Sequence, residues 1–154
     1  MAEGILSQHA CRAVVLTCMD FRFAGMRSSA AIEKAYGLRE NEYDIVALPG
    51  GAQNLTQFQL AEYHAESTLH ALGVAIDLHH VGTLVILSHQ NCGALKAVGK
   101  IFGGEEVDTE SKFHHEMLAE AAQVVKTEWP DKKIESGYLY VNESDTVVIN
   151  KVKI

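Results

Sequence analysis

Two short segments of this sequence carry side chains that could bind a metal ion. The first, CMDFR at 18–22, alternates a cysteine, an aspartate and an arginine, and the second, HQNC at 89–92, begins with a histidine and ends with a cysteine. Two thiolates and one imidazole form one of the ligand sets of catalytic zinc sites, in which water takes the fourth position. Sulfur and imidazole ligands favour zinc over magnesium or calcium. We therefore predict one zinc ion per chain, held by Cys18, His89 and Cys92.

The aspartate and arginine of the first segment could assist such a metal ion. Alternate side chains of an extended segment share a face, so we expect Asp20 and Arg22 to lie on the same side as Cys18. A guanidinium holds a carboxylate ionised through charge-assisted hydrogen bonds. Asp20 could then accept a proton from a zinc-bound water or hydroxide, or it could move onto the metal and close the fourth position. The simpler alternative is an ordinary salt bridge beside two core thiols.

The elements that must position these residues follow from the apolar runs. Nearly continuous apolar segments at 12–18, 43–49 and 83–89 are typical of strands in a parallel sheet that is covered on both faces. Helical patterns alternate with them, and the tail indicates two short strands around a turn at 143–145. The helical segments are 28–37, 55–80, 93–102 and 111–129. The predicted fold class is α/β, a parallel sheet flanked by helices with an extra C-terminal strand or hairpin, in a single domain over 1–154.

This topology brings the two segments together. Ligands of open α/β sheets sit at the carboxyl ends of the strands. Cys18 ends the first predicted strand, His89 ends the third, and the turn at 49–51 follows the second. We expect all three strand ends to meet at one edge of the sheet.

Composition limits the possible partners. The chain has 154 residues and a formal net charge of −7, which argues against nucleic acid or an anionic membrane as the main partner. No apolar run approaches the roughly 20 residues that span a bilayer, and no secretory signal begins the chain. Three cysteines are not a disulfide framework. We expect a soluble cytoplasmic protein with a small-molecule substrate.

The motifs CMDFR and HQNCG together resemble the signature of the β-class carbonic anhydrases, CxDxR followed by HxxC and a glycine, here Gly93. The resemblance covers roughly residues 12–150. It implies a parallel α/β fold, an obligate homodimer or higher homo-oligomer with zinc near the interface, and Cys18, His89 and Cys92 as the zinc ligands. It also implies a catalytic dyad of Asp20 and Arg22. The activity that it implies is the reversible hydration of carbon dioxide to bicarbonate through a zinc-bound hydroxide.

Two departures from the family pattern leave alternatives open. Phe21 stands where typical members have serine, and ALPGGAQN at 47–54 stands where many carry an Arg-Asn-Ala-Gly stretch. An apolar pocket could suit carbonyl sulfide or carbon disulfide, which are linear relatives of carbon dioxide. A second alternative is a catalytically silent zinc-binding module in which Asp20 permanently fills the fourth position.

The remaining candidate side chains have simpler interpretations. Cys11 has no partner at metal-ligand spacing, and we interpret it as structural. The other histidines on the predicted helices are expected to face solvent or cap helices rather than form a second metal site. Gln8 and His9 are interpreted as surface residues, although they could reach the catalytic pocket as a proton relay. Three phenylalanines are interpreted as core residues or as an apolar wall of that pocket: Phe21, Phe23 and Phe58.

Overall fold

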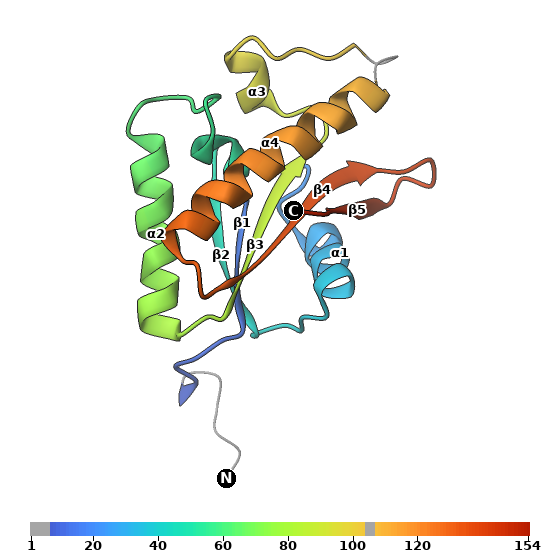
Figure 1. Cartoon of the computed structure of the whole chain (residues 1–154). Helices are drawn as coiled ribbons and strands as arrows, with labels where there is room; N and C mark the ends of the chain where they lie inside the picture. Colours follow the sequence, from blue (N-terminus) through green and yellow to red (C-terminus); the bar gives the residue numbers. More distant parts are fainter. Residues whose placement is uncertain (1–6, 104–106) are drawn as a thin grey trace.

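The protein is built on one five-stranded sheet. The computed structural model describes residues 7–103 and 107–154. The strands lie in the order β2-β1-β3-β4-β5, and all are parallel except β5, which runs antiparallel to β4 (Figure 1). Their bounds are Ala13–Cys18 for β1, Tyr43–Leu48 for β2, Thr83–His89 for β3, Lys133–Val141 for β4 and Val147–Val152 for β5. The predicted fold class, including the extra C-terminal strand, is confirmed.

Helices cover both faces of this sheet. The helices are α1, Met26–Tyr36; α2, His64–His79; α3, Gly93–Ala97; and α4, Val107–Glu128; a 3₁₀ helix, η2, covers Gly51–Leu55. Alternate side chains of β1 point into two separate cores. Val14 and Leu16 pack with Leu72 of α2 and Leu118 of α4, whereas the side chain of Val15 packs with residues of α1. This burial on both faces explains the continuous apolar run of β1.

The predicted helix over 55–80 is wrong over its first nine residues, because α2 begins only at His64, after η2 and a series of turns. Polar side chains in η2 and just after it hydrogen-bond to backbone groups and so compete with helix formation. Gln53 Nε2 donates to the carbonyl oxygens of Phe58 and Ala94, and the Thr56 hydroxyl donates to the Gln53 carbonyl oxygen.

The other boundaries differ less. Helix α3 ends at Ala97 rather than near 102, and Gly99 follows it with a φ of 83°. The predicted helix 93–102 is therefore too long, because the chain turns away after one and a half turns. Within the described ranges, no helix is both long and apolar enough to cross a membrane.

The strand ends that the sequence singled out do lie together. Strand β1 lies between β2 and β3, with Cys18 opposite Leu48 of β2 and Leu16 opposite Ile86 of β3. Their carboxyl ends meet at the edge of the sheet where η2 and α3 begin.

Candidate metal centre

Three potential metal ligands meet at this edge. The ligand atoms of Cys18, His89 and Cys92 all lie within 4.8 Å of one another. The three residues are 5%, 1% and 4% exposed, respectively. Cys18 closes β1, His89 closes β3, and Cys92 precedes the first residue of α3. The parallel sheet thus brings two distant sequence motifs into one buried cluster.

The histidine presents a free ring nitrogen to this cluster. His89 Nδ1 lies 2.8 Å from the carbonyl oxygen of Gln90. Because a carbonyl only accepts, Nδ1 carries the hydrogen and Nε2 keeps its lone pair. Nε2 is buried and has no hydrogen-bond partner among the described residues. The ring of Phe23 packs against the imidazole at 4.6 Å between centroids. An orphaned, oriented nitrogen of this kind fits a metal ligand.

The two thiols affect each other's ionisation in opposite directions. A hydrogen bond from Cys92 and the nearby His89 lower the pKa of Cys18 to about 4. The same hydrogen bond, together with burial, raises the pKa of Cys92. The backbone N–H of Gly50 also donates to Cys18 Sγ at 3.3 Å. A divalent cation would replace the remaining thiol proton, so this donor set fits zinc.

Beside the cluster, Asp20 and Arg22 form a bidentate ion pair. Arg22 Nε donates to Asp20 Oδ1 at 2.9 Å, and Nη2 donates to Oδ2 at 2.6 Å. The hydrogen bonds from Arg22 lower the pKa of Asp20 to about 2, although partial burial opposes the charge. Asp20 Oδ2 lies 3.8 Å from His89 Nε2. The carboxylate is therefore ionised, fixed in orientation and next to the potential ligands.

The reason for this placement differs from the one predicted. We expected Asp20 and Arg22 to share a face because the segment is extended. Instead β1 ends at Cys18, and the chain turns so that Phe23 N–H donates to the Asp20 carbonyl oxygen at 2.9 Å. The Arg22 backbone N–H also donates to Asp20 Oδ1 at 3.0 Å. A turn, rather than strand alternation, puts the two side chains together.

One further contact joins the two motifs. Arg22 Nη2 also donates to the carbonyl oxygen of Asn91, at 2.9 Å. Asn91 lies between His89 and Cys92 and has a φ of 55°. The Asp20–Arg22 pair thereby touches the turn that carries the other two potential ligands.

Sequence reasoning missed a buried pair behind this turn. The backbone N–H of Asn91 donates to Glu110 Oε1 at 2.5 Å, and Glu110 Oε1 lies 3.6 Å from His114 Nε2. Burial opposes the charge on Glu110, but the nearby His114 and the hydrogen bond from the Asn91 N–H outweigh it and lower the pKa of the carboxyl. Burial lowers the pKa of His114, so the imidazole is neutral.

The prediction that His114 faces solvent or caps a helix is wrong, because the residue is fully buried and stacks on Tyr138. Glu110 and His114 are four residues apart on α4, on the side that also buries Met117 and Leu118. That spacing was the available signal, because an acid and a histidine on the apolar face of a helix must find partners inside.

The predicted apolar wall forms only in part. Phe23 is buried beside His89, and Phe58 packs against Phe113 near the two cysteines. Phe21, by contrast, is 87% exposed. A small cavity of about 10 Å³ lies beside Cys92 and Glu110. This space holds about one water molecule.

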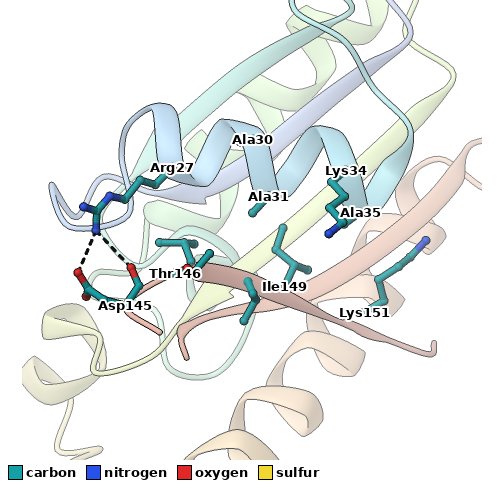
Figure 2. A pocket seen from close by; sticks show the side chains of 11 residues that line it. Arg27, Ala30, Ala31, Lys34, Ala35, Asp145, Thr146, Ile149 and Lys151 are labelled. Carbon is teal, nitrogen blue, oxygen red and sulfur yellow. Dashed lines mark hydrogen bonds and ion pairs between the residues drawn. The ribbon is translucent and has the colours of Figure 1, made fainter. Parts of the chain in front are cut away.

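A cavity of about 750 Å³ lies elsewhere, between α1 and β5. Figure 2 shows the Arg27–Asp145 ion pair at one end of it and Lys34 and Lys151 toward the other. None of the potential zinc ligands lines it. The candidate metal centre is therefore at the strand ends and not in this cavity.

Comparison with known families agrees with the fold and the motifs. The sequence model of a family described as "Putative carbonic anhydrase" matches residues 8–152, so the chain belongs to that family. Solved structures of β-class carbonic anhydrases share its fold, as the sequence motifs indicated.

Three solved structures illustrate the similarity. A carbonic anhydrase from Streptococcus mutans is 18% identical, with a TM-score of 0.60, over 95% of this chain and 84% of that one. A β-carbonic anhydrase from Trichomonas vaginalis is 16% identical, with a TM-score of 0.54, over 91% and 83%. A carbon disulfide hydrolase is 15% identical, with a TM-score of 0.50, over 90% and 78%. At these identities the likeness shows a common fold.

Proposed function

We propose that this protein is a zinc-dependent lyase that interconverts carbon dioxide and bicarbonate, with one zinc ion held by Cys18, His89 and Cys92. The observation that carries the proposal is the buried cluster of these three side chains beside an ionised carboxylate. Membership of the carbonic anhydrase family supports the reaction class. When bound, zinc would acidify a water molecule and so supply a nucleophile at neutral pH.

The carboxylate of Asp20 would orient the reacting water. With a pKa of about 2, Asp20 accepts hydrogen bonds and does not hold a proton at neutral pH. Its role is therefore to align the water by accepting one hydrogen bond, while the released proton passes to solvent. Arg22 keeps the carboxylate from rotating, because it engages both oxygens. Asp20 and Arg22 are the proposed catalytic residues.

A catalytically silent zinc protein is the alternative within the same cluster. There, Asp20 would leave Arg22 and fill the fourth metal position. The bidentate pairing favours the open arrangement, because moving one oxygen to the metal breaks a hydrogen bond of 2.6 Å or 2.9 Å. X-ray absorption of the zinc-loaded protein separates the two, since the silent form has a fourth protein ligand and the active form has water.

A sulfur-containing substrate is the second alternative. The fold is also that of a carbon disulfide hydrolase. Leu48, which follows the family pattern only loosely, is half-buried at the end of β2 opposite Cys18. Rates for carbon dioxide, carbonyl sulfide and carbon disulfide, measured on the same zinc-loaded sample, would rank the three substrates.

We also propose that the active form is a homodimer that completes the pocket. Three large apolar side chains follow Cys18 closely in the sequence and are exposed in the single chain: Met19 at 57%, Phe21 at 87% and Met26 at 90%. Exposed apolar groups in one neighbourhood are typical of an interaction surface. The small cavity beside Cys92 is too small to hold the substrate. An enclosed substrate pocket would therefore need a wall that the single chain does not supply. Phe21→Asp should yield monomers in analytical ultracentrifugation and reduce hydration, whereas Val74→Asp, on exposed α2, should do neither.

Stopped-flow hydration of carbon dioxide tests the main proposal. The sample is protein whose zinc content has been measured, with Cys92→Ser as the variant that should lose one zinc ion and all activity. Asp20→Asn should keep its zinc and lose about 100-fold in rate, the size of loss that follows from misplacing a reacting group. Asp131→Asn, an exposed acid far from the cluster, serves as the matched control and should behave as wild type. Zinc-loaded wild type without hydration activity would refute the proposed reaction.

A further inference from the structure

A second group of potential metal ligands lies at the opposite end of the sheet. Cys11 precedes β1, Asp44 is the second residue of β2, and His79 is the last residue of α2. Their ligand atoms all lie within 4.8 Å of one another. In Figure 1 the segment that enters β1 lies at the far end of the sheet from α3, so this cluster is separate from the one at Cys18.

The backbone holds these three side chains in place. Cys11 N–H donates to the His79 carbonyl oxygen at 3.0 Å, which fixes the start of β1 against the end of α2. Asp44 is paired with Val14 of β1 in the parallel ladder. His79 Nδ1 lies 2.6 Å from Asp44 Oδ2. Three segments that are remote in sequence thus present a thiol, a carboxylate and an imidazole to one point.

The interpretation of Cys11 as a structural residue, made because no partner lies at metal-ligand spacing in the sequence, is therefore incomplete. Its thiol is half-buried, and burial and the adjacent Asp44 charge raise its pKa. A bound metal ion would displace the thiol proton, and its charge would then neutralise the thiolate and the adjacent carboxylate. The Asp44–His79 contact alone is explained as an ion pair at a helix C-terminus. The Cys11 thiol donates to the carbonyl oxygen of Ala13 at 3.4 Å, but neither contact explains why the thiol lies beside the other two side chains.

Space is available for an ion and a fourth ligand. A cavity of about 210 Å³ opens over the cluster, and Cys11, Asp44 and His79 line it together with Gln8 and His9. The suggestion that Gln8 and His9 reach the pocket at Cys18 is wrong, because both line this second cavity. Gln8 Nε2 donates to the carbonyl oxygen of Asn41 at 3.0 Å, which ties the segment before Cys11 to the turn before β2.

We propose that Cys11, Asp44 and His79 form a second metal site, which takes a zinc-class divalent cation with water in the fourth position. Thiolate, imidazole and carboxylate are all zinc ligands, and the sulfur disfavours magnesium and calcium. Tetrahedral zinc places nitrogen and oxygen ligands about 3.3 Å apart. The ring of His79 must therefore move by less than about 1 Å, and its side chain is 47% exposed and free to do so. The ion would fasten the segment that enters β1 to both β2 and α2.

Metal stoichiometry tests this site independently of any activity. Metal-free protein is dialysed against zinc and analysed for zinc per chain, for wild type, Cys11→Ser, Asp44→Asn and His79→Gln. Asp44 and His79 are partly exposed, so these two variants should remain folded even if the cysteine variant does not. His80→Gln is the matched control, because this exposed histidine is adjacent in sequence and outside the cluster.

Each cluster variant should hold one zinc ion fewer per chain than wild type, whereas His80→Gln should hold as many. Under competition with a chelator, the remaining affinity of the mutated site should fall by more than about 100-fold, since even partners of ligands contribute 10–100-fold. With cobalt(II), the thiolate charge-transfer band of this site should persist in Cys92→Ser and disappear when Cys11→Ser is added. Equal zinc content in wild type, Asp44→Asn and His79→Gln would overturn the proposal.

Discussion

The packing of Gly51 against β1 can be tested with Gly51→Ala, which adds a single methyl group. A Cβ at Gly51 would lie 2.7 Å from the carbonyl carbon of Thr17 and 2.8 Å from the backbone nitrogen of Cys18. Real Cβ atoms do not approach backbone this closely, and a backbone atom of a central strand cannot move aside as a flexible side chain can. Gly51→Ala should therefore strain the strand end that carries Cys18.

The magnitude has two parts. Gly51 has a φ of 52°, a left-handed conformation that costs a non-glycine residue about 1 to 2 kcal/mol. Overpacking against the backbone adds about 1 to 3 kcal/mol. The sum, about 2 to 5 kcal/mol, is a large part of the stability of a typical domain.

Gly37→Ala measures the first part, the conformational cost, without the second. Gly37 has a φ of 62°, but a Cβ there would meet nothing within 4 Å. This variant should lose only the conformational cost of about 1 to 2 kcal/mol. Urea unfolding gives both values, provided that the slope of the transition is unchanged.

Zinc content completes the assay. Because the strained residue is Cys18 itself, Gly51→Ala should also bind zinc more weakly than Gly37→Ala. Equal destabilisation by the two substitutions would refute the close approach of Gly51 to β1. A loss of stability without a loss of zinc affinity would refute the link between this approach and the ligand position.

Three further predictions concern the candidate metal centre. The pKa of Asp20 is lowered from 3.8 to about 2, so its contribution to stability is present above pH 3.8 and is lost as the pH falls toward 2. In Arg22→Met, the midpoint of urea unfolding should therefore fall less steeply between pH 3.8 and 2 than in wild type. Glu110→Ala removes the acceptor for the Asn91 N–H and should weaken zinc binding roughly 10–100-fold in chelator competition, whereas Glu110→Gln, which keeps an acceptor oxygen, should bind nearly as wild type. Removal of zinc with a chelator should lower the melting temperature, and added zinc should restore it in proportion to the logarithm of its free concentration, because the ligand cluster exists only in the folded chain.

The sheet was predictable because burial on both faces leaves a simple signature. The continuous apolar runs at 12–18 and 83–89 correspond to β1 and β3 within a residue. The potential ligands Cys18 and His89 could be placed near each other for the same reason, since they end neighbouring parallel strands. The edge strand β2 was also found, although Ile45 is exposed there and four of its six residues are only partly buried.

The helix boundaries were harder to predict, because they depend on side chains that bond to distant backbone. The side-chain amide of Gln53 donates to the carbonyl oxygens of Phe58 and Ala94, and Ala94 belongs to α3. The local sequence contains no pattern that predicts this contact. The apolar positions at 60, 61 and 69 suggested one long helix, but the polar residues before them stabilise a turn instead.

The second cluster could not be predicted from spacing. Cys11, Asp44 and His79 come from three different elements, and their side chains meet only through the parallel pairing of β1 with β2 and the packing of α2. The prediction that Asp20 lies beside Arg22 was correct, but the reason given, strand alternation, was wrong because the segment is a turn.

The interior position of β1 has a consequence for how the chain folds. β1 is the first strand to be synthesised, yet it lies between β2 and β3, and β3 begins only at Thr83. Until β3 is made, one edge of this mostly apolar strand has no partner, so the growing chain carries an exposed aggregation-prone segment. Parallel pairing between remote segments also closes large loops, which slows folding. Cys18 likewise has no neighbouring potential ligand until His89 and Cys92 have been made. A metal ion would therefore bind all three only late in folding. Its binding would show that β1 and β3 have paired.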